Sequence, residues 1–575
     1  MDKKQVVEIL HEIATLLDLK GENPFKSRSY SNAARVLEST PEDLPSLVAP
    51  GRLEKLKGVG ESIAKKVREL DQTGKLVYYE ELKASLPQGL LEVLRIPNLG
   101  PKRVKVLYDK LGIKSVAELE YACNENRLLT LPGFGVKSQE NILKGIEFVK
   151  RSSNQYLFSV AWDSAQPLVD ALRGSPHVQN ASVAGSLRRR KEVVKDIDLV
   201  AASQDPDRVM DVFCSHDSID EVLEKGSTKS NVRLKNGISV DLRVVPPESY
   251  AFLLHHLTGS KNHNIAMRQR AIKMGLKMSE WGLFDKTDKS LVCRDEKEIF
   301  AALGMDEVPP EMREDMGEIE AAEAHALPAL IREGALVGLV HVHTNYSDGV
   351  NTVEEVVQHA AGLGYAYVAI SDHSQSASYA QGLKPADLER QWKEIDALQQ
   401  RYPGIRIFKG TESDILADGG LDYAESILKQ FDFVVASVHS RFNMGEDEMT
   451  ARIIRAIENP YTTILGHPSG RLLLGRDPYK INTERVLEAA AANRVAIELN
   501  ANPQRLDIDW RYLKKSKEMG ITISINPDAH SIVGAGDVRY GYGIARKGWI
   551  EADDVLNCRN AQGFEEFARA RRKGA

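Results

Sequence analysis

The chain has 575 residues, of which 42% are hydrophobic and 27% are charged. This balance is ordinary for a folded protein, and at roughly 150 residues per domain the length predicts about four domains; no apolar run reaches the roughly 18 residues of a membrane helix, and four scattered cysteines exclude a disulfide framework or zinc ribbon. The net charge of −6 divides unequally, with 46 Lys and Arg against 41 Asp and Glu in residues 1–300 and 30 against 41 in residues 301–575, which favours a polyanionic partner for the first part and bound cations for the second.

The N-terminal segment indicates where the protein works. Residues 1–20 carry acidic side chains in their first two turns and repeat apolar residues at helical spacing, unlike the basic head and continuous apolar core of a signal peptide. The cysteines lie at least 79 residues apart and are predicted to be free thiols in a reducing compartment. We therefore expect a cytoplasmic protein that binds no membrane, and we expect a monomer.

Residues 1–150 predict short helices separated by glycine turns, and one pattern occurs three times, at 56–67, 96–107 and 131–142. Glycines allow a tight turn that points the amides of the next helix at one phosphate without reading any base. The pattern resembles the helix-hairpin-helix motif. One copy is as easily a corner between packed helices, but three copies predict contact with DNA. The residues assigned to these contacts are Gly58, Gly60, Gly100, Lys102, Gly133, Gly135 and Lys137.

Strands mixed with helices follow from about 158 to 300. In the segment 185–200 a Gly-Ser turn offers small backbone donors to phosphate, arginines follow, and strand alternation sends Asp196 and Asp198 to one face. A later strand supplies Asp241. Three carboxylates on one face repel one another unless divalent cations hold them. The D-x-D pair alone is more often a solvated strand edge, but this context predicts a two-metal site for phosphoryl transfer.

Residues 1–300 resemble the family X DNA polymerases, the relatives of DNA polymerase beta. By this resemblance the two aspartates of the first strand bridge two Mg²⁺ or Mn²⁺ ions, and Asp241 is both a ligand and the group that activates the primer 3′-hydroxyl. The resemblance also implies that Gly185, Ser186 and Arg189 bind the triphosphate of the incoming dNTP.

The segment 255–271 resembles the nucleotide-binding segment of the same family. Gly259 would pack beneath the sugar, Asn264 would contact the base edge or the sugar, and Arg268 would reach the minor groove of the template. The chain has His256-Leu257 where the animal relatives have an aromatic pair, so rejection of ribonucleotides by this segment is an open question.

The N-terminal module resembles the small domain that binds the 5′-phosphate side of a DNA gap. In animal relatives a lysine of this domain forms a Schiff base with an abasic sugar, and counting from the first hairpin glycines assigns that position to Lys66. Lys65 is adjacent, and Ser62 replaces a phosphate-binding lysine. Lyase chemistry and simple electrostatic binding of phosphate are both open interpretations of the two lysines.

The acidic stretch 301–334 carries Pro309-Pro310 and is predicted to be a linker or a covering segment. From 335 a unit of about 30 residues recurs, in which a short apolar run ends in a polar cluster and is followed by a helix. Seven such units predict a (β/α)₇-like barrel whose site lies at the carboxyl ends of its strands. The runs are 336–343, 366–373, 406–413, 433–440, 462–469, 495–502 and 523–530.

Histidines and carboxylates end these runs. His341 and His343 stand two residues apart on a strand, which puts both imidazoles on one face, as one metal ion requires. The pattern resembles the PHP (polymerase and histidinol phosphatase) domain over about 335–570. The resemblance implies hydrolysis of phosphoesters with up to three Mn²⁺, Zn²⁺ or Fe ions, and Arg441 or Arg471 is a candidate for holding the substrate phosphate. By residue match the ligands are His341, His343, Asp348, His373, Glu412, His439, His467, Asp528 and His530.

The predicted architecture is multidomain α and α/β, and the predicted function is a family X DNA polymerase that fills short gaps in DNA repair, with a 3′–5′ exonuclease in the barrel. One alternative is a nuclease or phosphatase with an inert polymerase half, and another is a DNA-end-binding protein; the intact aspartate trio argues against both. The predicted domains are a small helical lyase-like domain (1–85), a helical domain with two hairpins (86–155), a nucleotidyltransferase palm (156–235, continuing over 236–300), a linker (301–334) and the PHP barrel (335–575).

Overall fold

The computed structural model describes residues 3–40, 42, 44–48, 52–96, 99–150, 155–570 and 572. They divide into two compact units, Met1–Val149 and Lys150–Ala575. Pro97 and Asn98 of the second hairpin copy lie outside the described residues, as do residues 151–154 at the predicted end of the second domain.

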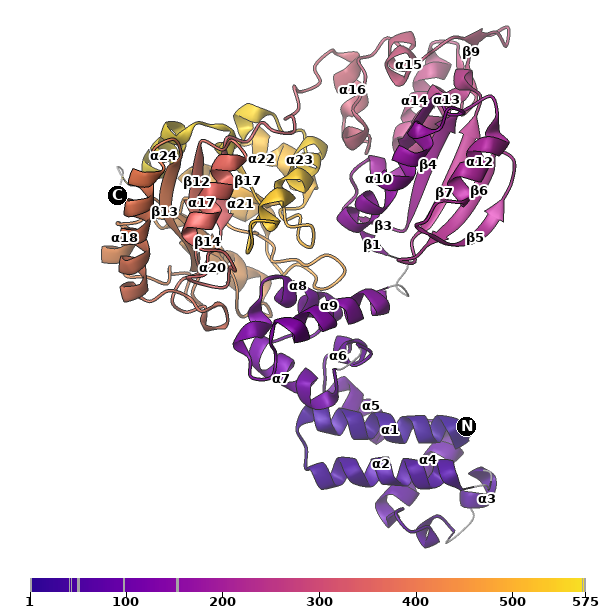
Figure 1. Ribbon diagram of the computed structural model, residues 1–575, viewed down its shortest axis with the longest axis vertical. Helices are drawn as coiled ribbons and strands as arrows, with labels where there is room; N and C mark the ends of the chain where they lie inside the picture. The colour runs from indigo at the N-terminus through magenta and orange to yellow at the C-terminus, as the bar shows by residue number, and fades with distance from the viewer. Residues whose placement is uncertain are drawn as a thin grey trace. The chain divides into compact units, whose positions relative to one another are not determined.

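The first unit is helical throughout its described part (Figure 1). Its helices bury one apolar stripe each, as in α4, where Ile63, Val67 and Leu70 follow one another at helical spacing. Two separate apolar clusters result, one within residues 6–82 and one formed mostly by residues 90–146. The helices are α1 (Lys3–Lys20), α2 (Pro24–Ser39), α3 (Leu44–Val48), α4 (Glu61–Thr73), α5 (Val77–Ala84), α6 (Gly89–Val93), α7 (Pro101–Leu111), α8 (Val116–Asn124) and α9 (Val136–Lys150).

The second unit starts with a five-stranded sheet in the order β2-β4-β7-β6-β5, in which only β4 and β7 run parallel. Helices α10 (Phe158–Gly174) and α12 (Pro206–Cys214) pack on the face that carries Ile197 and Val240, and α13 (Pro247–Thr258) packs beside Val200. The strands are β2 (Asn180–Val183), β4 (Asp196–Ala202), β5 (Ile219–Lys225), β6 (Lys229–Leu234) and β7 (Ser239–Val245); β1 (Tyr156–Leu157) pairs with β3 (Val193–Val194), and α11 (Gly185–Arg188) follows β2.

A smaller helical region with a three-stranded sheet comes next. It shares one apolar cluster, to which the stretch 301–334 contributes Leu303, Val308 and Met312. That stretch therefore packs as a covering segment. We call residues 155–334 the sheet region. The elements are α14 (Lys261–Lys273), β8 (Lys277–Ser279), β9 (Gly282–Phe284), β10 (Ser290–Leu291), α15 (Glu296–Ala302) and α16 (Glu318–Glu323).

Residues 335–570 form the predicted barrel. Its seven strands are parallel and each pairs with the next along the chain, while a bridge from Val342 to Ala529 nearly closes the ring. Each of the seven runs predicted as strands overlaps one of these strands. They are β11 (Gly338–Val342), β12 (Tyr367–Ile370), β13 (Arg406–Asp414), β14 (Phe433–Ser437), β15 (Ile464–Leu465), β16 (Ala496–Asn500) and β17 (Ile523–Asn526).

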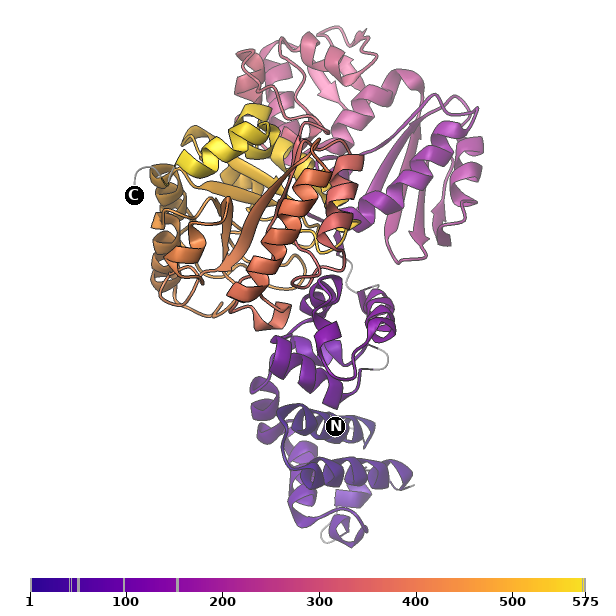
Figure 2. The ribbon, with the colours of Figure 1, turned by 60° about the vertical axis from the view of Figure 1, so that its left-hand side comes forward.

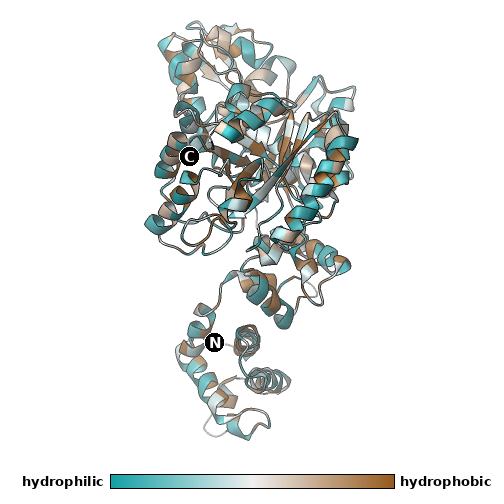
Figure 3. Cartoon of the chain, turned by 90° about the vertical axis from the view of Figure 1, so that its left-hand side faces the viewer, coloured by the Kyte–Doolittle hydropathy of each residue, from teal (hydrophilic) through white to brown (hydrophobic). Residues whose placement is uncertain are grey.

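Helices surround the barrel, and the strands inside them are the browner, more apolar layer (Figures 2 and 3). The last helix closes the amino ends of the strands, since Phe564 packs against the rings of Tyr367, Phe408 and Phe433. The opposite mouth is thereby left for polar residues. The helices are α17 (Val353–Gly362), α18 (Pro385–Arg401), α19 (Glu425–Leu428), α20 (Glu446–Glu458), α21 (Thr483–Asn493), α22 (Leu513–Glu518), α23 (Val538–Lys547) and α24 (Ala561–Ala570).

Candidate active sites

Three aspartates meet on one face of the five-stranded sheet. Asp196 and Asp198 begin β4, and Asp241 of β7 lies directly beside Asp198 in the parallel register. The residues between them, such as Ile197 and Val240, are buried in the core, so the carboxylates project from the other face. The structure thus brings together the three aspartates that the sequence singled out.

The negative charges of this trio oppose one another. Burial, followed by the charges of Asp196 and Asp241, raises the pKa of Asp198 to about 6. Burial and then the charge of Asp241 also raise the pKa of Asp196. Lys229 Nζ lies 3.6 Å from Asp241 Oδ1 and offsets only part of this charge. Carboxylates that resist ionising together form a donor set that fits divalent cations.

The Gly-Ser turn lies directly against these carboxylates. Gly185 has φ +62°, and a Cβ at this position would lie 2.0 Å from Asp198 Oδ2, so no larger residue fits. The amide of Ala184 donates to the carbonyl of Asp198 at 2.7 Å. Ser186 follows in α11, partly exposed. The predicted phosphate-binding turn and the carboxylates therefore form one site.

Arg189 and Gly259 also meet beside this turn. Arg189 Nε donates to Glu314 Oε1 at 3.0 Å, and its Nη1 donates to the carbonyl of Thr258. Gly259 has φ +65°, and a Cβ there would lie 3.3 Å from Arg189 Nη1. Sequence reasoning found the arginine and the glycine but missed Glu314, which lies in the stretch that was predicted to be a linker or cover.

Asn264 and Arg268 lie one turn apart on α14. Asn264 Nδ2 donates to the carbonyl of His256 at 2.7 Å, and Arg268 Nε donates to the carbonyl of Asn264 at 3.2 Å. The buried Oδ1 of Asn264 has no hydrogen-bond partner among the described residues. Asn264 is therefore held in place by its own segment and keeps an acceptor for a ligand.

All nine predicted barrel ligands meet at the carboxyl mouth. Eight of them fall into three groups whose ligand atoms lie within 4.8 Å of one another. The ninth, His467, places Nε2 2.9 Å from Glu412 Oε1. The groups are His343, Asp348, His373 and His530; His341, His343 and Asp528; and His373, Glu412 and His439.

His341 lies in β11 and His343 follows directly after its end, and the backbone here departs from a regular strand. The strand register shifts between Val340 and Val342, and His341 at the shift has φ +64°. Such a bulge redirects one side chain. It lets His341 and His343 approach with ring centroids 5.3 Å apart.

Several imidazole nitrogens in the mouth are buried without a hydrogen bond. They include Nε2 of His341 and both ring nitrogens of His343 and His373. Buried polar atoms are normally satisfied, and an imidazole nitrogen among carboxylates is a preferred ligand of Zn²⁺, Mn²⁺ and Fe ions. The residues present therefore fit bound metal ions.

Two buried carboxylates orient these histidines and were missed by sequence reasoning. Glu498 Oε1 lies 2.5 Å from Nδ1 of His341, while its other oxygen accepts from the amide of His467 at 2.6 Å. Asp414 Oδ1 lies 2.6 Å from Nδ1 of His439. Such contacts fix the ring and leave Nε2 as the nitrogen that would bind a metal ion. A signal was available for Glu498, since it is a charged residue inside the apolar run 495–502.

Opposite charges balance in the mouth. Burial alone would lower the pKa of His341, but the carboxylates of Glu498, Asp528 and Glu412 raise it well above its usual range. Burial would likewise raise the pKa of Glu412, but His439 and His373 hold it well below. By contrast, burial and the neighbouring His530 and His373 lower the pKa of His343 to about 3, which keeps this ring neutral and able to bind metal.

The two arginines considered for the substrate phosphate differ. Arg471 is buried and donates to the carbonyls of Arg505 and Leu506 and to Asp509 at 3.1 Å, so its donors are engaged away from the ligands. Arg441 is exposed in the loop after His439. Of these two arginines, Arg441 is therefore the one whose side chain is exposed.

The hairpin glycines precede helices in the first unit. Gly60 and Gly100 are the N-caps of α4 and α7, without a side-chain cap, and a Cβ at either position would meet nothing within 4 Å. The first helical amides there are thus accessible. Gly58 and Gly133 adopt positive φ, as their turns require, and Gly135 lies just before α9. Lys102 and Lys137 stand exposed in the first turns of α7 and α9.

Lys66 differs sharply from Lys65. Lys66 Nζ donates to Ser62 Oγ at 3.1 Å and lies 4.9 Å from the centre of the Tyr78 ring, in an open depression of about 610 Å³. Burial lowers the pKa of Lys66. Lys65 is exposed and forms an ion pair with Glu61 at 2.8 Å. Of the two, Lys66 has the environment of a nucleophilic amine.

Comparison with known proteins gives matches over the whole chain. Four family models match: a helix-hairpin-helix domain at residues 1–76, a SAM-like helix-hairpin-helix tandem at 90–147, the DNA polymerase beta thumb at 253–314 and the PHP domain at 340–502. The DNA polymerase/3′-5′ exonuclease PolX of Bacillus subtilis (strain 168) is 38% identical over 572 residues, 99% of this chain and all of that protein. A probable phosphatase of Thermoanaerobacter sp. (strain X514) is 32% identical over 230 residues, 38% of this chain and 88% of that protein.

Among the described residues, no helix is long and apolar enough to cross a membrane.

Proposed function

Because the chain belongs to the family X DNA polymerases that carry a C-terminal PHP domain, we propose that it fills short gaps during DNA repair and that the residues assigned from the sequence perform the two reactions. The protein is a DNA polymerase with 3′–5′ exonuclease activity. It binds DNA, uses dNTPs and depends on divalent metal ions.

Nucleotide addition takes place at the aspartate trio. Asp196 and Asp198 hold two Mg²⁺ or Mn²⁺ ions together with Asp241, and a carboxylate oxygen of Asp241 accepts the proton of the primer 3′-hydroxyl. When bound, the ions supply positive charge for phosphoryl transfer. Support comes from the contact of Gly185 with Asp198, which leaves the Gly185-Ser186 turn to receive phosphate beside the carboxylates.

The nucleotide is also held by Arg189, which follows α11, and by the segment at the start of α14. Arg189 contributes a guanidinium to the triphosphate, and Gly259 leaves room for the sugar. Asn264 offers its unpaired Oδ1, and Arg268 extends from the next turn toward the template.

Excision takes place at the mouth of the barrel. The nine ligands hold up to three Mn²⁺, Zn²⁺ or Fe ions, which supply Lewis acidity for phosphoester hydrolysis. Glu498 and Asp414 keep His341 and His439 in the orientation that the ions need. Exposed Arg441 binds the phosphate of the terminal nucleotide.

The observation that carries this proposal is the pairing of Asp198 with Asp241 beside Gly185. The first prediction is that Asp241→Ala lowers nucleotide addition at least about 1,000-fold, because one group provides both a ligand and the base. Excision from a 3′-labelled primer on gapped duplex should persist. Asp220→Ala, which removes an exposed carboxylate of β5, is the matched control. Undiminished extension by Asp241→Ala would contradict the assignment, and loss of excision would favour a single shared site.

The first unit binds the gap through backbone amides at its hairpin helices, aided by Lys102 and Lys137, and so has little sequence preference.

We further propose that Lys66 is the nucleophile of an abasic-site lyase activity. The second prediction is that Lys66→Ala reduces borohydride trapping of an abasic-site adduct at least about tenfold, while Lys65→Ala traps like wild type. If both variants trap as much adduct as wild type, neither lysine performs the chemistry.

A further inference from the structure

A buried lysine of the barrel points toward the polymerase site. Lys547 is the last residue of α23, its side chain is fully buried, and the ammonium lies 4.5 Å from the centre of the Trp510 ring. Its Nζ donates to Glu314 Oε1 at 2.5 Å and to the carbonyl of Arg189 at 3.0 Å. A buried ammonium is tolerated only when it is paired. Both of these partners belong to the sheet region and not to the barrel.

Glu314 connects this lysine to the proposed triphosphate ligand. The same oxygen, Oε1, accepts from Lys547 Nζ and from Arg189 Nε at 3.0 Å. Arg189 Nη1 is bound to the carbonyl of Thr258, whereas no hydrogen bond reaches its Nη2 within the described chain. The guanidinium is therefore fixed on two sides and keeps one nitrogen for a ligand.

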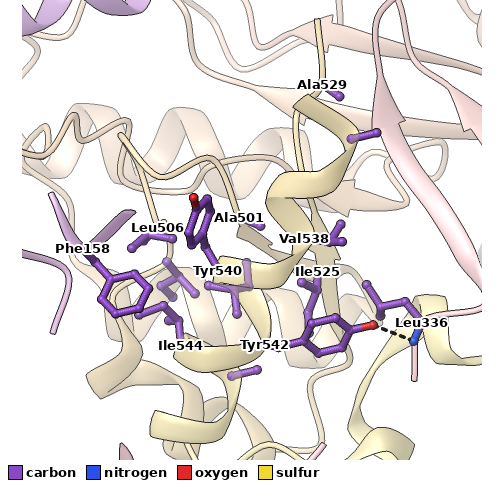
Figure 4. Close-up of a cluster of buried hydrophobic side chains, with 14 of the residues drawn as sticks. Phe158, Leu336, Ala501, Leu506, Ile525, Ala529, Val538, Tyr540, Tyr542 and Ile544 are labelled. Carbon is purple, nitrogen blue, oxygen red and sulfur yellow. Dashed lines mark hydrogen bonds between the residues drawn. The ribbon is translucent and has the colours of Figure 1, made fainter. Parts of the chain in front are cut away.

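The helix that carries Lys547 is packed tightly at this place. The guanidinium of Arg190 stacks on Trp162 at 4.0 Å, and a Cβ on Gly543 of α23 would lie 3.2 Å from Arg190 Cγ. Figure 4 shows Tyr540 of α23 near Phe158, and their rings meet edge to face at 6.1 Å. Because α23 packs closely against α10 and Arg190, Lys547 has little freedom to move away.

We propose that Lys547 is a positioning residue of the polymerase: through Glu314, the exonuclease barrel holds the Arg189 guanidinium in the orientation that binds the triphosphate. The inference rests on the proposed role of Arg189. Two effects follow from the geometry. Glu314 removes rotamer freedom from Arg189 before the nucleotide arrives, and Lys547 cancels the negative charge of Glu314, so the three side chains together keep one positive charge for the phosphates.

The test measures gap filling with Lys547→Met in the full-length protein. We expect the KM for dNTP to rise about tenfold or more while kcat changes less than about threefold, because a pre-set binding group is lost and the aspartates are intact. Lys547→Arg should recover part of the loss. Arg539→Met is the matched control, since Arg539 is also a cation of α23 that reaches the sheet region, at Asp163, but it touches neither Glu314 nor Arg189. Release of a 3′-terminal label should be unchanged in all three variants.

Two further variants separate the possible failures. If Arg189→Met leaves the KM for dNTP unchanged, the proposed role of Arg189 is wrong and the inference fails with it. If Arg189→Met raises the KM but Lys547→Met does not, only the inference is overturned. Glu314→Gln decides the matter should Lys547→Met melt at a lower temperature than wild type: a raised KM supports the connection, and an unchanged KM overturns it. Titration with a non-hydrolysable dNTP analogue should show the same order of affinities.

Discussion

The two clusters of metal-binding candidates in this protein are built on opposite plans. At the barrel mouth, histidines and carboxylates are mixed, almost wholly buried, and braced by Glu498 and Asp414. On the five-stranded sheet, three carboxylates of one sign stand together, and Asp241 keeps 29% of its side chain exposed. Only the barrel cluster can balance its charges internally.

This difference affects the charge of the ligands at each site and how readily ions exchange there. In the barrel, neighbouring carboxylates hold the pKa of His341 high and histidines hold the pKa of Glu412 low, so the ligands stay in place by mutual attraction. In the sheet, burial and then the charges of Asp196 and Asp241 raise the pKa of Asp198 to about 6, so the ionised form of this carboxylate is disfavoured relative to that of an isolated one. Because the barrel ligands are buried and those of the sheet are partly open, we expect ions to exchange more slowly in the barrel than on the sheet.

The third prediction, with the largest effect, removes one barrel ligand. His341→Ala or Asp528→Ala should abolish release of nucleotides from a 3′-labelled primer, because each lies in a group whose atoms already converge within 4.8 Å. Addition of dNTP should persist. His359→Ala, on α17, serves as the control. Thermal melting must first show that each variant is folded, and two well-folded variants with wild-type excision would make the barrel's ions structural.

The fourth prediction is that, after metal ions are removed with a chelator, the two activities recover at different rates. After long dialysis against EDTA and addition of excess Mn²⁺, addition of dNTP should return at once, whereas excision should recover slowly, because the barrel ligands are buried and those of the sheet are partly open. Ion loss should also lower a melting transition by about 5–10 °C if free ion at 100 times Kd stabilises by about 2.7 kcal/mol. Simultaneous recovery of both activities would contradict the expected difference in ion exchange between the barrel and the sheet.

The two clusters also differ in how much of each could be predicted from the sequence. The barrel was predictable because apolar runs recur with polar residues at their ends, and parallel strands bring those ends to one mouth. Its nine candidate ligands were assigned by residue match to the PHP domain. The fold class was confirmed in this way. The bulge at His341 was not predictable, since nothing in a run of Leu, Val and His indicates a residue with φ +64°.

Contacts between distant segments were the hardest to predict. Asp198 and Asp241 were each identified, but their direct pairing depends on β4 and β7 being parallel neighbours although two strands intervene in the chain. Glu314 and Lys547 stand 233 positions apart, and neither belongs to a recognisable motif. Their roles depend on packing, which a local pattern does not contain.

The fifth prediction, with the smallest effect, concerns the bracing of the barrel cluster. Glu498→Gln keeps the size of the side chain but removes the charge that faces Nδ1 of His341 at 2.5 Å. Metal affinity, measured by competition with a chelator, should fall about 10–100-fold, and excision should be restored by raising Mn²⁺. Glu488→Gln, at an exposed position of α21, should change neither quantity. An unchanged affinity would mean that the buried carboxylate is structural, and the internal balance of charge, rather than the bracing, would then be what distinguishes the barrel from the sheet.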